Sequence, residues 1–66
     1  MTKIQKIQKL GNGRWNLHFA SVTDTETVLS EARKRDLDVE ESDLTSIRVN
    51  SHHVYKALFN KNIITK

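Results

Sequence analysis

The clearest pattern in the chain is an alternation of apolar and polar residues between residues 14 and 20. The apolar members are Trp15, Leu17 and Phe19. A period of two places them on one face of an extended segment, as in a half-buried β-strand. The preceding residues 11–13 are Gly-Asn-Gly, and both residue types readily adopt the positive φ that tight hairpin turns need. We therefore predict a β-hairpin made of residues 3–10 and 14–20.

The next segment carries the signature of a helix start. Thr23-Asp24-Thr25-Glu26 fits a capping box, in which the Thr23 hydroxyl accepts from an amide of the first turn and Glu26 reaches back. The apolar stripe that follows is made of Val28, Leu29 and Ala32. Basic residues at 33–35 fall in the last turn, where the helix dipole favours cations. This pattern predicts a helix over residues 24–36.

Residues 37–49 allow two interpretations. Asp38 and Glu41 can cap a short helix that carries Leu44 and Ile47, whereas Ile47 and Val49 alternate as they would in a strand. We favour the short helix, ending near Ile47.

The closing segment predicts another helix. Asn50 or Ser51 can cap it, and its apolar residues recur at i, i+1, i+4 and i+5, which gives one broad apolar face. These residues are Val54, Tyr55, Leu58 and Phe59. The expected fold class is therefore α+β, with an N-terminal β-hairpin followed by two or three short helices.

Sixty-six residues allow one small domain, residues 1–66, which can be complete or a fragment of a longer chain. A chain of this size buries only about 60% of its unfolded surface, so it can fold alone or depend on a homodimer mate or a target. The absence of cysteine excludes disulfides and thiolate zinc sites and fits a reducing, cytoplasmic compartment. No segment has the apolar length of a signal peptide or a membrane span, so we expect no membrane partner.

The net charge of +3 is unevenly distributed along the chain. All eight acidic residues lie between Asp24 and Asp43, where only three basic residues accompany them. The segments before and after this acidic block carry four basic residues each and no acid. Such asymmetry bears on partners and association rates rather than on the fold.

Signatures of catalysis and metal binding are missing. The sequence has no nucleophile elbow, no HExxH helix and no glycine-rich phosphate loop. His18, His52 and His53 match no zinc-ligand spacing, and adjacent helical residues point about 100° apart. We therefore expect no enzymatic activity, no cofactor and no metal.

The basic N-terminal segment favours nucleic-acid binding. The candidate phosphate-binding residues are Lys3, Lys6, Lys9 and Arg14 in the hairpin, with Lys56 and Lys61 in the closing helix as a second group. Cations on a ribbon can neutralise phosphates, and a neighbouring aromatic ring can stack on a base. Trp15 shares its face with Leu17 and Phe19, so we expect it to anchor the core rather than to serve as a stacking platform.

Several short stretches share a pattern with one known family. They are Thr2-Lys3-Ile4, Gln8-Lys9, Arg14-Trp15-Asn16-Leu17, Val28-Leu29, the run from Leu37 to Ile47, and Tyr55-Lys56-Ala57-Leu58. They resemble the N-terminal segment of Firmicute-type RecX recombinase regulators. The resemblance implies a protein that lies along a recombinase filament and limits its activity.

Two functional hypotheses follow from the sequence. The first is a small non-enzymatic regulatory module that binds DNA, or a DNA-bound protein such as a recombinase filament, through its basic β-hairpin. The second is a protein-binding inhibitor or adaptor of phage or host type that makes no nucleic-acid contact. The acidic block and an exposed apolar tail at residues 63–64 favour the second.

Overall fold

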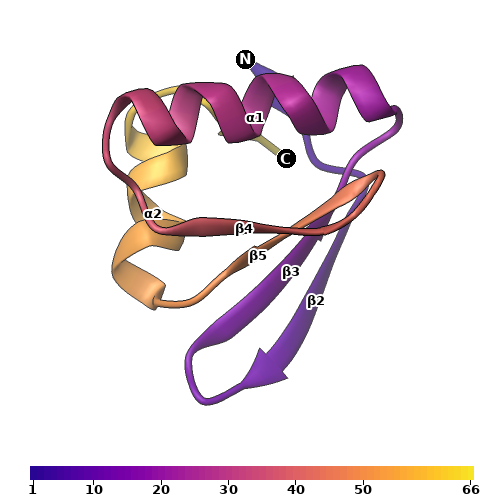
Figure 1. Ribbon diagram of the computed structural model, residues 1–66. Coiled ribbons are helices and arrows are strands. Elements are labelled where there is room, and N and C mark those ends of the chain that lie inside the picture. The colour runs from indigo at the N-terminus through magenta and orange to yellow at the C-terminus, as the bar shows by residue number, and fades with distance from the viewer.

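The computed structural model describes residues 1–66 as an α+β fold with two helices and six strands (Figure 1). The elements are β1 (Thr2–Lys3), β2 (Lys6–Gly11), β3 (Arg14–His18), α1 (Val22–Lys34), β4 (Val39–Asp43), β5 (Ser46–Val49), α2 (His52–Asn60) and β6 (Ile64–Thr65). The predicted α+β class, N-terminal hairpin, first helix and closing helix are confirmed, but the structure adds strands β1, β4, β5 and β6 to the predicted hairpin and helices. The short helix predicted within residues 37–49, ending near Ile47, is wrong, because this segment forms β4 and β5.

The strands form two sheets. The larger is antiparallel with the strand order β2-β3-β5-β4, and the smaller pairs β1 with β6 in parallel. The buried apolar residues of both helices and of the β1–β6 pair belong to one core cluster with Leu17, Ile47 and Val49 of the larger sheet. These elements therefore pack on one face of the larger sheet, the core face. The opposite face, which we call the open face, carries Asn16, His18 and Arg48.

The first hairpin turns through residues in the left-handed region of φ. Gly11, Asn12 and Gly13 have φ of 84°, 53° and 75°. Glycine and asparagine are the residues that adopt this conformation at least cost, so the Gly-Asn-Gly turn is confirmed. The first strand begins at Lys6 rather than at residue 3, because Thr2–Lys3 pairs instead with the C-terminal β6.

Helix α1 begins two residues earlier than predicted. Ser21, with extended backbone, is the N-cap, and its hydroxyl accepts a hydrogen bond from the Asp24 amide at 3.1 Å. Thr23 lies inside the helix, so the predicted capping box centred on it is wrong. Two hydroxyl residues suited to capping, Ser21 and Thr23, stand two positions apart, and the structure uses Ser21.

Both helices end in Schellman motifs. Asp36 and Asn62 adopt positive φ of 56° and 59°, and the amides of Leu37 and Ile63 donate to the carbonyls of Ala32 and Leu58. Each motif turns the chain back toward the core. The second brings Ile63 and Ile64, the latter being the first residue of β6, into the core, so the predicted exposed apolar tail is wrong.

Residues 39–49 form a hairpin instead of a helix. Val39 opposes Val49 on the core face and is buried. The acidic residues of β4 that follow it are exposed, on both faces of the strand. The turn is fixed by the Asp43 carboxylate, which accepts from the Thr45 amide at 2.9 Å. The alternation of Ile47 and Val49, the less favoured of the two interpretations, is therefore the correct one.

Candidate nucleic-acid interface

The β2–β3 hairpin carries three of the predicted phosphate-binding residues, and all three are exposed. Lys6 opposes His18, and Arg14 lies two residues before Asn16, so both belong to the open face. Lys9 opposes Trp15 and belongs to the core face. The hairpin therefore presents cations on both of its faces and has no acidic residue.

Lys9 also fixes the environment of Trp15. Its Nζ lies 5.6 Å from the indole centroid, and the Tyr55 ring of α2 stacks on the same indole at 4.6 Å with an interplanar angle of 9°. Trp15 is half-buried and packs against the core. The face of the indole that stacks on Tyr55 is therefore not free to receive a base. This arrangement matches the prediction that Trp15 anchors the core.

The open face of the hairpin carries a row of polar side chains. Nε2 of His18 lies 3.3 Å from Asn16 Nδ2 and 3.4 Å from Gln8 Oε1. Asn16 is only 8% exposed, and its Oδ1 has no hydrogen-bond partner. This oxygen is shielded from solvent by its neighbours, so the accessible polar groups of the row are those of Gln8 and His18.

The row ends in an ion pair at the far strand. Arg48 of β5 donates to Glu40 of β4 across the ladder, and the guanidinium lowers the pKa of that carboxyl below its ordinary value of 4.5. The charge of Arg14 adds a smaller effect in the same direction. The positive charge of the open face is therefore concentrated at the hairpin, and Glu40 offsets it at the β4 side.

The other three predicted residues do not lie on the hairpin. Lys3 belongs to β1, which contacts α1 at the top of the molecule in Figure 1. Lys56 is an exposed residue of α2. Lys61 caps α2 and lines a hollow together with Glu31 and Arg35 of α1. Their role in DNA contact stays a prediction.

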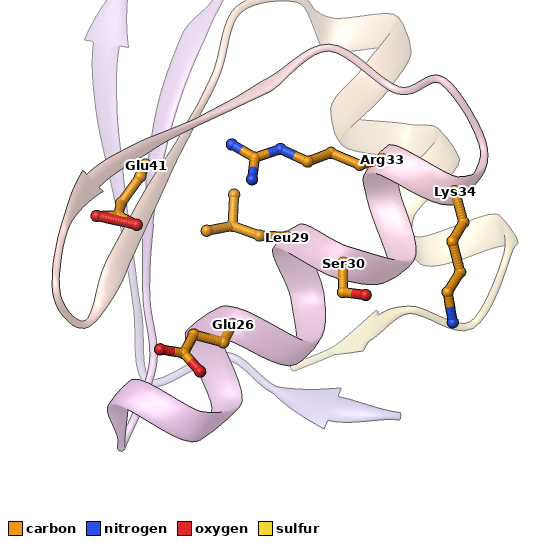
Figure 2. Close-up of a pocket in the computed structure, with 6 residues that line it drawn as sticks. All are labelled: Glu26, Leu29, Ser30, Arg33, Lys34 and Glu41. Atoms are coloured by element: carbon orange, nitrogen blue, oxygen red, sulfur yellow. The ribbon is translucent and has the colours of Figure 1, made fainter.

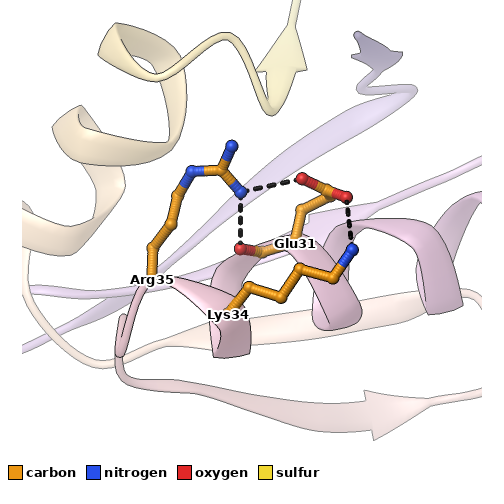
Figure 3. Close-up of polar contacts among 3 residues, drawn as sticks. All are labelled: Glu31, Lys34 and Arg35. Atoms are coloured by element: carbon orange, nitrogen blue, oxygen red, sulfur yellow. Dashed lines mark hydrogen bonds and ion pairs between the residues drawn. The ribbon is translucent and has the colours of Figure 1, made fainter.

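The acidic block belongs to α1, the loop after it and β4, and β4 is the edge strand farthest from β2. Glu31 of α1 is bound by Arg35 at 2.7 Å and by Lys34 at 3.4 Å, and the Arg35 hydrogen bond is the larger cause of its lowered pKa (Figure 3). Between α1 and β4 lies a shallow cleft of about 580 Å³, and the Arg33 side chain extends from α1 toward the β4 side of it (Figure 2). Its lining residues are Glu26, Leu29, Ser30, Arg33, Lys34 and Glu41. The mixed charges give this cleft no strong preference for one sign of ligand.

The histidines take part in no cluster. No group of three or more His, Asp or Glu side chains is placed to hold a metal ion. His18 lies on the open face, and His52 stands beside the Trp15–Tyr55 stack at 6.3 Å from the indole.

Sequence reasoning missed Arg48 as a neighbour of the hairpin. The predicted short helix ended near Ile47, so the sequence did not indicate that Arg48 pairs with Asn16 across the ladder. The available signal was the alternation of Ile47 and Val49, which places Arg48 on the face opposite the core.

No known protein family, curated protein or solved structure matches this chain. The resemblance to RecX-type regulators therefore stays a prediction. Neither helix is long and apolar enough to cross a membrane.

Proposed function

We propose that this domain is a non-enzymatic regulatory module that binds double-stranded DNA through the β2–β3 hairpin. One observation carries the proposal. The hairpin bears Lys6, Lys9 and Arg14, all exposed and none in an ion pair within the protein, and it extends away from α1 (Figure 1).

The distribution of cations over both faces suits insertion into a groove. The major groove of B-DNA admits a two-stranded β-ribbon, and phosphates line both of its walls. Lys6 and Arg14 would approach one wall and Lys9 the other. Around the tip, positions Gly11 and Gly13 have no other atoms of the protein near the place of a Cβ, so the turn can approach a groove floor closely.

Salt dependence of binding tests the proposal. Three phosphate contacts give a slope of about −2.7 for log K against log salt, or about a 40-fold loss of affinity between 50 and 200 mM salt. Binding of a short duplex is followed by fluorescence anisotropy of the labelled DNA. The Lys6→Gln/Lys9→Gln variant is expected to reduce the slope by about 2.

The matched control is Arg33→Gln/Lys34→Gln, which removes the same charge from α1, away from the hairpin tip. It is expected to keep the slope of the parent protein. Equal losses in the two variants would show that only net charge matters, and no binding at low salt would refute the proposal.

A protein target is the second candidate function, and one observation favours it. Strands β2 and β4 are both unpaired edges of the sheet, and an edge strand can pair with an extended segment of another protein. A DNA-bound recombinase filament, which the RecX resemblance implies, would combine both kinds of contact. Capture of the domain by recombinase in the absence of DNA, with no binding to free DNA, would favour the protein-binding inhibitor or adaptor.

A further inference from the structure

The two edges of the larger sheet carry opposite charges. Edge strand β2 contains Lys6 and Lys9 and no acid, whereas edge strand β4 contains Glu40, Glu41 and Asp43 and no base. All five side chains are exposed. Both complementary edges thus occur on one chain.

We propose that copies of this chain associate edge to edge, with β2 of one copy hydrogen-bonded to β4 of the next. The proposal commits to a second copy as the occupant of each edge. It does not rest on DNA binding, although Lys6 and Lys9 serve in both proposals, and its test measures the mass of the protein in the absence of DNA.

Strand direction permits this pairing. Every neighbouring pair in β2-β3-β5-β4 is antiparallel, so β2 and β4 of one copy run in opposite directions. A second copy added in the same orientation therefore places its β2 antiparallel to the β4 edge. The same orientation also keeps the open faces of the two copies on one side.

The charged side chains then meet on matching faces. Glu40 and Lys6 oppose Arg48 and His18 on the open face, while Glu41 and Lys9 oppose Ile47 and Trp15 on the core face. Each face of the junction thus has one glutamate from β4 and one lysine from β2. Parallel addition or a flipped copy would separate these pairs.

One register satisfies both pairs. It overlaps residues 39–42 of one copy with residues 6–9 of the next, with Glu40 opposite Gln8 and Glu41 opposite Ile7. Lys6 is then diagonal to Glu40, and Lys9 is diagonal to Glu41, at a spacing of about 7–8 Å that long side chains bridge. The irregular positions of the two strands lie beyond Lys9 and beyond Glu41, so the backbone is regular over most of the overlap.

Pairing of like edges is disfavoured. Two β2 strands would bring lysines together and two β4 strands would bring carboxylates together, which is destabilising across a ladder. Charged residues on edges commonly serve to block such association. The remaining combination is heterologous, so it forms open chains of copies rather than a closed dimer.

Sedimentation velocity over a range of concentrations tests the proposal. At low salt the average mass of the parent protein is expected to rise beyond twice the monomer mass of 7.6 kDa, and to fall again at high salt. The overlap is short and buries little area, so we expect the average mass to rise only at protein concentrations of about 0.1–1 mM.

Charge reversal separates edge pairing from general attraction. Lys6→Glu/Lys9→Glu has two acidic edges and Glu40→Lys/Glu41→Lys has two basic edges, so each alone is expected to stay monomeric. An equimolar mixture of the two is expected to associate again. If circular dichroism shows that Glu40→Lys/Glu41→Lys does not fold, the single variant Glu41→Lys takes its place, because it keeps the Glu40–Arg48 ion pair.

The matched control is Lys56→Glu/Lys61→Glu, which changes the net charge as much as Lys6→Glu/Lys9→Glu but lies outside the sheet edges. It is expected to associate as the parent does. Amide exchange should slow in β2 and β4 as the concentration rises. A parent protein that stays at 7.6 kDa near 1 mM, a mass limited to a dimer, a mixture that stays monomeric, or slower exchange outside β2 and β4 would each overturn the proposal.

Discussion

Replacing Ile64 with alanine tests whether the C-terminal strand is part of the core. Ile64 is 1% exposed and belongs to the single cluster of buried apolar residues. Strand β6 is held to the N-terminus by hydrogen bonds from Thr2 N to Ile63 O at 3.0 Å and from Ile4 N to Thr65 O at 2.8 Å. Truncating a fully buried isoleucine to alanine costs about 2–5 kcal/mol. Because a short edge pair can relax around the cavity, we expect about 2–3 kcal/mol here.

That loss is large for a domain of this size. A 66-residue domain has a free energy of unfolding of about 3–10 kcal/mol, so the variant loses a third or more of it in most of that range. Urea unfolding measures the loss, with Trp15 fluorescence as the signal, since its stack on Tyr55 reports separation of α2 from the sheet. Leu44→Ala is the matched control, because Leu44 is 69% exposed and should change stability by less than about 0.5 kcal/mol. Equal stabilities of the two variants would refute the reasoning that β6 completes the core.

Three further outcomes are expected. Asp36→Gly should raise the free energy of unfolding by about 0.5–1 kcal/mol in urea titrations, because glycine fits the positive φ and removes an anion from the C-terminal end of α1; an unchanged midpoint would contradict this. Ser21→Ala should cost about 1 kcal/mol and Thr23→Ala under about half of that, and the reverse order would restore the predicted capping box. The pKa values of Glu31, Glu40 and Asp43 are lowered by Arg35, Arg48 and the Thr45 amide respectively, so their contribution to stability is present above pH about 4.5 and is lost as the pH falls through the lowered values. Urea midpoints measured from pH 7 to pH 3 should therefore decline, and the decline should be smaller for Glu40→Gln. An identical decline in that variant would show that Glu40 does not contribute to the pH dependence of stability.

Local patterns were sufficient for most elements of the fold. The Gly-Asn-Gly turn and the alternation after it specify the first hairpin, because positive φ and a period of two each have one structural solution there. The cap at Ser51 and the broad apolar face of α2 are equally local signals. These elements could be predicted without knowledge of any contact between distant segments.

The predictions that were wrong concern segments whose structure depends on partners distant in the sequence. The acids of β4 are poor strand formers, and only the ladder with β5 and the Asp43 turn make this segment extended. Ile63 and Ile64 are isolated apolar residues near the end of the chain, and their burial requires β1, which lies at the other end. Local propensity favoured a helix and an exposed tail because the residues of each segment contain no information about its partner strand, which is β5 for β4 and β1 for β6.

The candidate site was predicted in part for the same reason. Lys6, Lys9 and Arg14 follow directly from the hairpin, whereas the separation of Lys3 from them follows from the β1–β6 pair. The strand order also determines where the unevenly distributed charges of the sequence lie in the fold. The basic N-terminal segment supplies one outer strand and the acidic middle supplies the other, so the order β2-β3-β5-β4 places the two charges on opposite edges of one sheet. Interchanging the places of β4 and β5 would leave the acids inside the sheet beside β3. The strand order, more than the composition, therefore makes the edges complementary.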